Sequence, residues 1–255
     1  MDGGPQVRLV ADAAALADAA AQAIVDAAVE SVAARGRFSI VLTGGSTPRA
    51  TYMRLAAPPF AERVPWDRTW VFFGDERCVP PDHPESNYHT AYETLLSKVP
   101  VSGEHVFRLR GEAEDPEAAA TEYARTLAGV FETRRGGLPR FDLVLLGMGL
   151  DGHTASLFPG SPAIKEVFRP VVAVHATAAV HSQRLTLTLP PINAAARIIF
   201  LVSGAEKAKA VKAMLRDGVV LPAAMVRPAD GTLTWIVDRA AASLLPPDRG
   251  AHSPR

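Results

Sequence analysis

The chain of 255 residues has one cysteine, no excess of either charge and no long apolar run. The lone Cys78 forms no internal disulfide, which is typical of a reducing compartment, and we expect a cytoplasmic protein. The 27 basic residues balance the 27 acidic residues, so the composition favours neither nucleic acid nor anionic lipid as a partner. The N-terminus lacks the basic and apolar regions of a secretion signal, and no run of about 18 apolar residues occurs. We therefore expect no membrane and no nucleic-acid partner, and the sequence identifies no protein partner.

Several catalytic motifs are also absent. No Gly-Lys-Ser/Thr follows the glycine pair Gly44-Gly45, which argues against a nucleoside triphosphate P-loop. No Gly-x-Ser-x-Gly elbow occurs, which argues against a serine hydrolase of the α/β-hydrolase type. The seven histidines show neither a His-Glu-x-x-His nor a His-x-His pattern, so we expect no metal site. Cys78 has only its neighbour Arg77 to lower its pKa, and we interpret it as a small buried side chain rather than a nucleophile.

What the chain does contain is an alternation of short apolar runs and helical segments. The expected strands are Phe38–Thr43, Thr69–Phe73, Leu143–Leu146, Pro170–Val174, Arg184–Leu189, Ile198–Val202 and Leu233–Val237. Helices are expected near residues 11–35, 48–57, 86–97, 116–134 and 205–216. This order predicts an α/β fold, a three-layer Rossmann-like domain whose mostly parallel sheet carries helices on both faces. We expect one domain over residues 1–255, with loose ends at 1–6 and 246–255.

One of these strands differs in pattern from the others. Arg184–Leu189 alternates polar and apolar residues more than the other runs do. Such alternation is typical of a strand with one exposed face, often in an antiparallel sheet. The pattern predicts a partly exposed or antiparallel strand here.

The most informative segment is an apolar strand that ends in a glycine-rich turn. Leu143–Leu146 is followed by Gly-Met-Gly-Leu-Asp-Gly-His, which carries Asp151 and His153. Parallel sheets bind ligands at the carboxyl ends of their strands. With an ordinary pKa of about 6.5, a histidine accepts protons at neutral pH, so His153 is a candidate general base. Asp151 is expected either to orient His153 or to contact the substrate. The competing interpretation of His153 as a structural histidine fits its position less well.

The same turn also fits the G-x-G-x-x-G pattern of a dinucleotide site, and we reject that interpretation. The pattern requires a helix that starts within it and a carboxylate about 20 residues later, at the end of the next strand. Here Pro159 and Pro162 stop any long helix, and the next strand-like run is followed by His175. We therefore expect no nicotinamide cofactor.

A second glycine-rich loop, Thr43-Gly-Gly-Ser-Thr-Pro48, follows the first expected strand. Thr47 is predicted to be the N-cap of a helix whose first residue is Pro48. Glycines before a helix expose backbone N–H groups, and the helix dipole favours an anion there. The loop therefore predicts a phosphate site made by Gly44, Gly45, Ser46 and Thr47. The alternative is a plain turn with a good cap.

The second expected strand ends in Gly74-Asp-Glu-Arg77. In the functional interpretation Asp75 and Glu76 position groups, and Arg77 binds a substrate oxygen or a phosphate. The alternative is a structural ion pair that steadies the loop. Downstream, Asn87 lies in Ser-Asn-Tyr at the start of a helix, where its side chain is available to bind a sugar or to cap the helix.

Two more cations are candidates for binding an anion. Arg184 begins the alternating strand, and Lys207 opens the helix that follows Ser203-Gly204. Each has a plain alternative, a cationic side chain that lies in solvent. The sequence leaves open which of Arg77, Arg184 and Lys207 holds a phosphate.

Taken together, these motifs resemble the 6-phosphogluconolactonase family, which is related to the glucosamine-6-phosphate deaminases. The loop at 43–48, Gly74-Asp-Glu-Arg77, Ser86-Asn-Tyr88 and the segment 147–156 occur in the order of that family, followed by Leu-Phe-Pro-Gly and Arg184-Leu-Thr. The resemblance implies hydrolysis of 6-phosphogluconolactone in the oxidative pentose phosphate pathway, with a sugar phosphate as substrate and no cofactor.

The resemblance also implies roles for the candidate residues. The amides of Gly44 to Ser46, helped by Arg184 and Lys207, hold the phosphate, and His153 activates water. Arg77 and the backbone N–H groups of the turn at 147–152 are the candidates to stabilise the oxyanion.

Two alternatives remain. A deaminase-like isomerase carries a second acid in an Asn-Glu-Pro segment, where this chain has Leu157-Phe158-Pro159. Phe158 cannot move protons, so the lactonase is favoured. A non-catalytic sugar-phosphate sensor of the transcription-regulator kind would carry a basic helix-turn-helix, and the alanine-rich N-terminal helix has no basic cluster.

Overall fold

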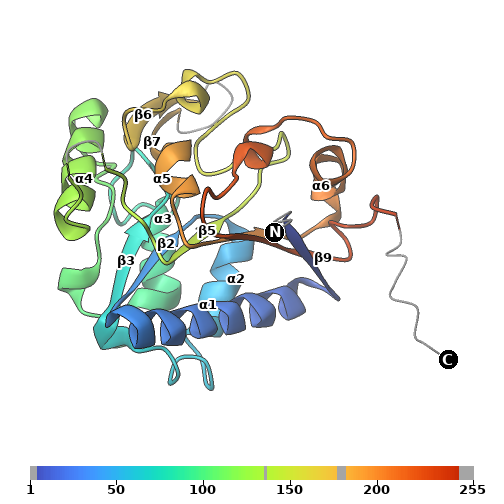
Figure 1. The fold of residues 1–255 in the computed structure, drawn as a ribbon, viewed down its shortest axis with the longest axis horizontal. Helices are drawn as coiled ribbons and strands as arrows, with labels where there is room; N and C mark the ends of the chain where they lie inside the picture. The colour runs from blue at the N-terminus through green and yellow to red at the C-terminus, as the bar shows by residue number, and fades with distance from the viewer. Residues whose placement is uncertain (1–4, 135–136, 177–181, 247–255) are drawn as a thin grey trace.

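The computed structural model describes residues 5–134, 137–176 and 182–246, and its centre is a parallel β-sheet between helical layers (Figure 1). Six strands pair in the order β1-β9-β8-β5-β2-β3, and every pair is parallel. Their bounds are β1 (Gln6–Val10), β2 (Phe38–Leu42), β3 (Thr69–Phe73), β5 (Leu143–Leu146), β8 (Arg197–Val202) and β9 (Thr232–Asp238). The predicted mostly parallel α/β architecture is confirmed.

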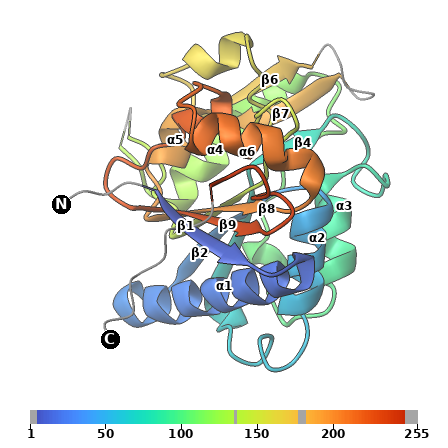
Figure 2. The same cartoon turned by 90° about the vertical axis from the view of Figure 1, so that its right-hand side faces the viewer.

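Helices cover both faces of this sheet. In Figures 1 and 2, α1 (Ala13–Arg35) and α2 (Ser46–Leu55) lie on one side, and α5 (Leu189–Asn193) and α6 (Ala208–Leu215) lie on the other. Every residue of β2 and β5 is buried, as expected for strands that are covered on both faces. The inner side of α1 is mostly alanine, which lets the helix lie close to the sheet. No helix within the described ranges is long and apolar enough to cross a membrane.

A second, smaller sheet is antiparallel and lies beside the main one. It contains β4 (Asp75–Arg77), β7 (Gln183–Leu187) and β6 (Val171–His175) in the order β4-β7-β6, and α4 (Pro116–Val130) packs against it. The Leu187 N–H donates to the Gly74 carbonyl at 2.8 Å, where the chain passes from β3 to β4. The antiparallel strand predicted from the alternation after Arg184 is therefore confirmed, although it ends at Leu187 and Leu189 begins α5.

Several other predicted boundaries are wrong. Gln6 is not loose but begins β1, which is mostly exposed and is held by pairing with β9. The rest of the end segments predicted to be loose, apart from Pro5 and residue 246, lies outside the described residues. Asp75–Arg77 is a short strand rather than a loop. The helix predicted over 116–134 ends at Val130.

A further correction concerns the start of α2. This helix begins at Ser46, and its N-cap is Gly45 rather than Thr47. Gly45 has φ +114°, a value that glycine adopts without strain and other residues rarely do. No side chain caps this helix end, so its first amides have no side-chain acceptor.

The predicted helix at 86–97 is made of two parts. The α-helix α3 (Asn87–Ala91) is capped by the Ser86 hydroxyl, and a π-helical turn, Tyr92–Leu96, continues it.

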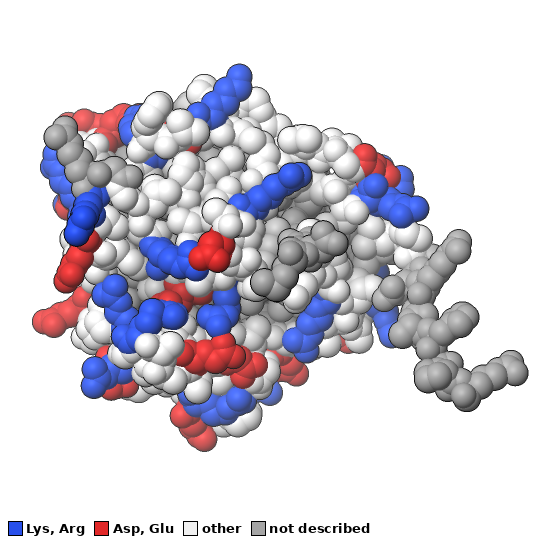
Figure 3. All heavy atoms as spheres, viewed as in Figure 1, with Lys and Arg blue, Asp and Glu red and all other residues white. Residues whose placement is uncertain are grey.

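Basic and acidic side chains are interspersed over the lower part of the face seen in Figure 3.

Candidate active site

A cleft of about 280 Å³ opens at the carboxyl ends of β2, β5 and β8. This volume is just below the range for small-molecule sites, which begins at about 300 Å³. The residues that line it and were predicted from the sequence are Gly44, Gly45, Ser46, Thr47, Asp75, Arg77, Asn87, His153, Arg184 and Lys207. The fold therefore brings together ten of the eleven predicted site residues in this lining, and Asp151 is the one that is not part of it.

Asp151 contacts the imidazole of His153. Its Oδ1 accepts from the backbone N–H of His153 at 3.1 Å and lies 2.6 Å from the ring Nδ1. A ring nitrogen that donates to a carboxylate leaves the other nitrogen, Nε2, free to accept a proton. Burial raises the pKa of Asp151, but the hydrogen bonds and the charge of His153 outweigh that effect, and the net pKa lies below its usual range. The turn has no room for a side chain at Gly149, where a Cβ would lie 2.1 Å from the His153 Nδ1.

The loop before α2 presents backbone N–H groups to the cleft. Since Gly45 is the N-cap and no side chain caps the helix, the amides at Ser46 and Thr47 lie at the positive end of the helix dipole. Gly44 has its own constraint, because a Cβ there would lie 1.8 Å from the Asn87 Oδ1. The side chain of Asn87 thus packs on the backbone of this loop.

Asp75 is buried and is held by neighbouring side chains. Its Oδ2 accepts from the Ser156 Oγ at 2.7 Å, and its Oδ1 accepts from the Asn87 Nδ2 at 3.1 Å. Ser156 belongs to the turn that carries His153, and Asn87 begins α3. Asp75 therefore ties three separate segments of the cleft together. Ser156 was missed by the sequence reasoning, although it lies within the segment 147–156 that carried the resemblance.

Glu76 has a different role from its neighbour. Its Oε1 accepts from the backbone N–H groups of Arg77 and Asn87 at 2.8 and 2.7 Å. Its Oε2 accepts from the Tyr88 N–H at 2.8 Å and from the Ser86 Oγ at 2.9 Å. Burial raises the pKa of Glu76, and these four hydrogen bonds oppose the rise. The side chain anchors the first turn of α3, in place of the ion pair considered from the sequence.

Two arginines lie next to each other on neighbouring strands of the small sheet. Arg77 on β4 is the register partner of Arg184 on β7, and both line the cleft. The Arg77 Nη1 donates to the Glu85 carbonyl at 2.9 Å and also to the Asn87 Oδ1. Burial lowers the pKa of Arg184, the charge of Asp75 opposes this, and the charge of Arg77 lowers it further. An anion placed between two such guanidinium groups would relieve their repulsion.

The residues that come after β8 in the chain form the remaining wall of the cleft. Lys207 ends a 3₁₀ turn, Ala205–Lys207, and Glu206 lines the cleft beside it. The turn is held by Asp238, whose carboxylate accepts from the Ser203 hydroxyl and from the Gly204 N–H. The acidic side chain of Glu206 was not predicted, and no motif signals it.

Two other sequence predictions bear on the chemistry of the site. Within residues 5–134, 137–176 and 182–246, no three His, Cys, Asp or Glu side chains come together as a metal site. Cys78 is half-buried, and burial, reinforced by the charge of Glu76, raises the pKa of its thiol. A raised pKa does not favour a nucleophilic thiolate.

Comparisons with known proteins identify the family of this chain. A family model described as glucosamine-6-phosphate isomerases/6-phosphogluconolactonase matches residues 11–235. A 6-phosphogluconolactonase of Streptomyces coelicolor is 38% identical, over 96% of this chain and 97% of its own length. A probable chloroplastic 6-phosphogluconolactonase of Oryza sativa is 39% identical, over 85% and 68%. The structure of 6-phosphogluconolactonase from Trypanosoma brucei superposes with a TM-score of 0.83 at 33% identity, covering 96% of this chain and all of that one.

Proposed function

Because the chain belongs to the glucosamine-6-phosphate isomerase/6-phosphogluconolactonase family, we propose His153 as the general base of its reaction. The chain is an enzyme that hydrolyses 6-phospho-D-glucono-1,5-lactone to 6-phospho-D-gluconate in the pentose phosphate pathway. The observation that supports the role of His153 is its contact with Asp151, 2.6 Å from Nδ1, at the edge of a cleft that also holds a helix N-terminus and two arginines. In this proposal Asp151 orients the base and does not contact the substrate.

The phosphate of the substrate binds at the start of α2. The amides at Gly45, Ser46 and Thr47 donate to its oxygens, and Arg184 supplies the opposing charge. Burial weakens the hydration of that guanidinium, which strengthens a charge-assisted hydrogen bond to an incoming anion. Lys207, on the neighbouring turn, adds a second positive charge. This anchor fixes the distance between the phosphate and the lactone carbonyl.

The carbonyl end of the lactone lies at His153. The Nε2 of His153 takes a proton from water as the water oxygen attacks the carbonyl carbon. The negative charge that develops on the carbonyl oxygen is stabilised by Arg77 and by backbone N–H groups of the turn at 147–152. As the bond to the ring oxygen breaks, the protonated His153 returns its proton to that oxygen, which becomes the hydroxyl of 6-phosphogluconate. No metal and no cofactor takes part in this sequence.

A deaminase-like isomerization is less well supported. Ring opening and proton transfer between carbons need a further carboxylate next to the base. At the position where the deaminases carry that acid, this chain has Phe158, whose ring centroid lies 4.6 Å from that of His153.

The test is acid release from 6-phosphogluconolactone in weakly buffered solution, with His153→Gln as the comparison. We expect the wild type to release acid far above the spontaneous rate, and the variant to lose roughly 100- to 10,000-fold in kcat. Calorimetric binding of 6-phosphogluconate should survive in the variant, which shows that the cleft is intact. Near-normal kcat in His153→Gln would refute the assignment of the base. Binding without acid release by the wild type would instead indicate a sensor.

The proposal also covers the cellular compartment of the enzyme and its partners. We place the enzyme in the cytoplasm, supported by its single cysteine, and we expect no nucleic-acid partner, supported by its zero net charge.

A further inference from the structure

The turn that follows His153 is held at both ends by hydrogen bonds. Thr154 donates from Oγ1 to the Gly147 carbonyl at 2.9 Å, and the Leu157 N–H donates to the Thr154 carbonyl at 2.9 Å. Between them, the Ser156 hydroxyl donates to the buried Asp75 at 2.7 Å. The turn is therefore fixed to the residue that follows β5 on one side and to β4 on the other.

The conformation of Ala155 shows how strongly the turn is constrained. Its φ is +47°, in the left-handed region that residues other than glycine rarely occupy. Such a conformation persists where the surrounding structure imposes it. Phe158 follows this turn, and Pro159 restricts the backbone of Phe158 itself. The side chain of Phe158 thus leaves the backbone in a set direction.

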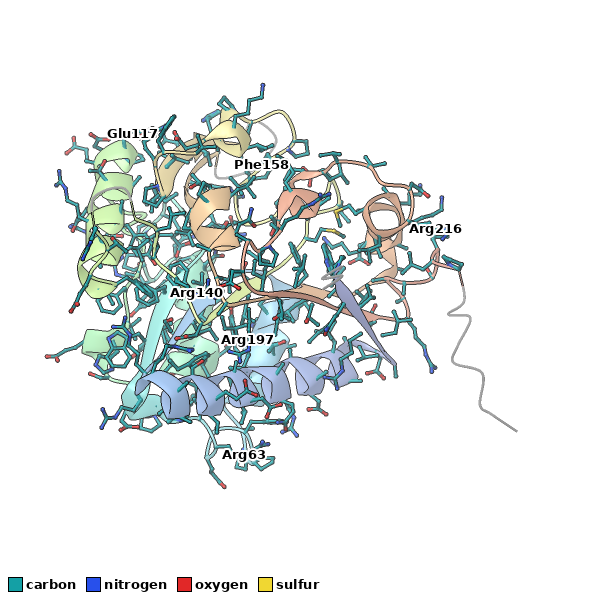
Figure 4. All side chains as sticks on the ribbon, viewed as in Figure 1. Arg63, Glu117, Arg140, Phe158, Arg197 and Arg216 are labelled. Atoms are coloured by element: carbon teal, nitrogen blue, oxygen red, sulfur yellow. The ribbon has the colours of Figure 1, made fainter. Side chains whose placement is uncertain are left out.

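The ring of Phe158 contacts two functional side chains at once. Its centroid lies 4.6 Å from that of the His153 imidazole, at an interplanar angle of 43°. The Arg184 Cζ lies 5.7 Å from the centroid of the same ring. A cation within about 6 Å of an aromatic ring face is attracted by it. Figure 4 shows Phe158 in the upper part of the molecule, on the segment that leads from the turn to the helical turn Pro162–Lys165.

We propose that Phe158 is a positioning residue for both ends of the substrate site, an inference that rests on the function proposed above. By its contact with His153, the ring of Phe158 limits rotation of the imidazole. The imidazole Nδ1 therefore keeps its hydrogen bond to Asp151, and Nε2 is presented to water. The ring also stabilises the imidazolium that forms when His153 takes the proton. Against Arg184, the ring holds the guanidinium in the cleft and supports its charge. Phe158 performs both roles without contacting substrate, since it does not line the cleft.

The experiment compares three variants with the wild type. Phe158→Leu keeps an apolar side chain but removes the aromatic ring, and Phe158→Tyr keeps the ring. Phe168→Leu is the matched control, because Phe168 is 90% exposed and lines no part of the cleft. For each protein, kcat and KM are measured with 6-phosphogluconolactone, the Kd of 6-phosphogluconate is measured by calorimetry, and Tm is measured by circular dichroism.

We expect Phe158→Leu to lower kcat and to raise the Kd of 6-phosphogluconate, each by about 3- to 30-fold, the range of a cation–π contact. Phe158→Tyr and Phe168→Leu should stay within about twofold of the wild type in both. In an Arg184→Ala background, Phe158→Leu should not raise the Kd further, because the guanidinium it supports is gone.

Two results would overturn the inference. One is wild-type kcat and Kd in Phe158→Leu, whatever the change in Tm, which would give the ring a structural role alone. The other is a Phe158→Tyr variant as impaired as Phe158→Leu, which would assign the loss to altered packing. If even the wild type released no acid, the proposed function would fail, while the Kd values would still decide the contact with Arg184.

Discussion

Arg184 is the residue that we expect to distinguish a phosphorylated lactone from an unphosphorylated one. It is partly desolvated at the wall of the cleft, opposite Arg77 in the register of β4 and β7. Arg184→Ala should raise KM for 6-phosphogluconolactone by roughly ten- to a hundredfold, because charge-assisted hydrogen bonds contribute about 1.5–3 kcal/mol. Hydrolysis of unphosphorylated gluconolactone should change little. The measurement is kcat/KM for both substrates.

The control for this prediction is Arg216→Ala, an exposed arginine at the end of α6 (Figure 4). It should leave both substrates unaffected. Equal losses on the two substrates in Arg184→Ala would place that arginine at the carbonyl or in the fold rather than at the phosphate.

Asp151 should make stability depend on pH in the acid range. Burial opposes its ionisation, but the hydrogen bonds and charge of His153 hold its folded pKa below the unfolded value, which is about 3.9. A carboxyl group whose pKa is lower in the folded than in the unfolded protein stabilises the fold at pH values above its unfolded pKa. This stabilisation is lost as the pH falls through the folded pKa. The Tm difference between the wild type and Asp151→Asn should therefore be largest above about pH 5 and should shrink as the pH falls below about 4. A difference that stays constant with pH would contradict this account.

At the scale of an element, the first turn of α3 depends on Glu76. Glutamine in its place would direct an amide N–H₂ at backbone donors, and at least one of those donors would lose its acceptor. Glu76→Gln should cost about 1–3 kcal/mol of unfolding free energy, because a buried donor is left unpaired. For a protein of this size each kcal/mol corresponds to about 2–4 °C in Tm. Since the turn carries Asn87, kcat/KM should fall as well.

Glu93→Gln is the matched control for this element. Glu93 is exposed on the π-helical turn that continues α3, and its substitution should leave Tm within about 1 °C, as surface changes usually do. An unchanged Tm in Glu76→Gln would mean that water or a rearranged loop replaces the lost acceptor.

At the scale of the whole molecule, we propose that the chain unfolds as one domain. One apolar cluster extends from α1 through the strands of the main sheet to β9, and it includes Leu185 and Leu187 of the small sheet. The Asp75–Ser156 hydrogen bond further joins the small sheet to the turn after β5. Differential scanning calorimetry should therefore show one peak, with a calorimetric enthalpy close to the van't Hoff enthalpy. Two peaks, or a ratio well above one, would show that the small sheet melts separately.

The sequence by itself determined five of the six strands of the main sheet, all but β1, and the loops at the carboxyl ends of β2, β3 and β5. The strands β2, β3, β5 and β8 are mostly apolar runs, and such runs signal burial without reference to distant residues. The pairing of Asp151 with His153 is equally local, since the two are separated by one glycine. The glycines at 44–45 and 147–152 could be interpreted for the same reason, because turn chemistry depends on neighbours in the chain.

Only the tertiary structure decided how the side chains of distant segments pair. Strand β1 is mostly exposed and forms because β9 lies beside it, so its own residues carry no clear signal. The motif Gly-Asp-Glu-Arg does not show that its two carboxylates have different partners. Asp75 accepts a hydrogen bond from Ser156, which is 81 positions away in the chain, and Glu76 accepts one from the start of α3. The contact of Phe158 with Arg184 likewise depends on the path of β7. Such contacts arise from the crossing of strands that are remote in the chain, and local propensity and periodicity contain no information about that crossing.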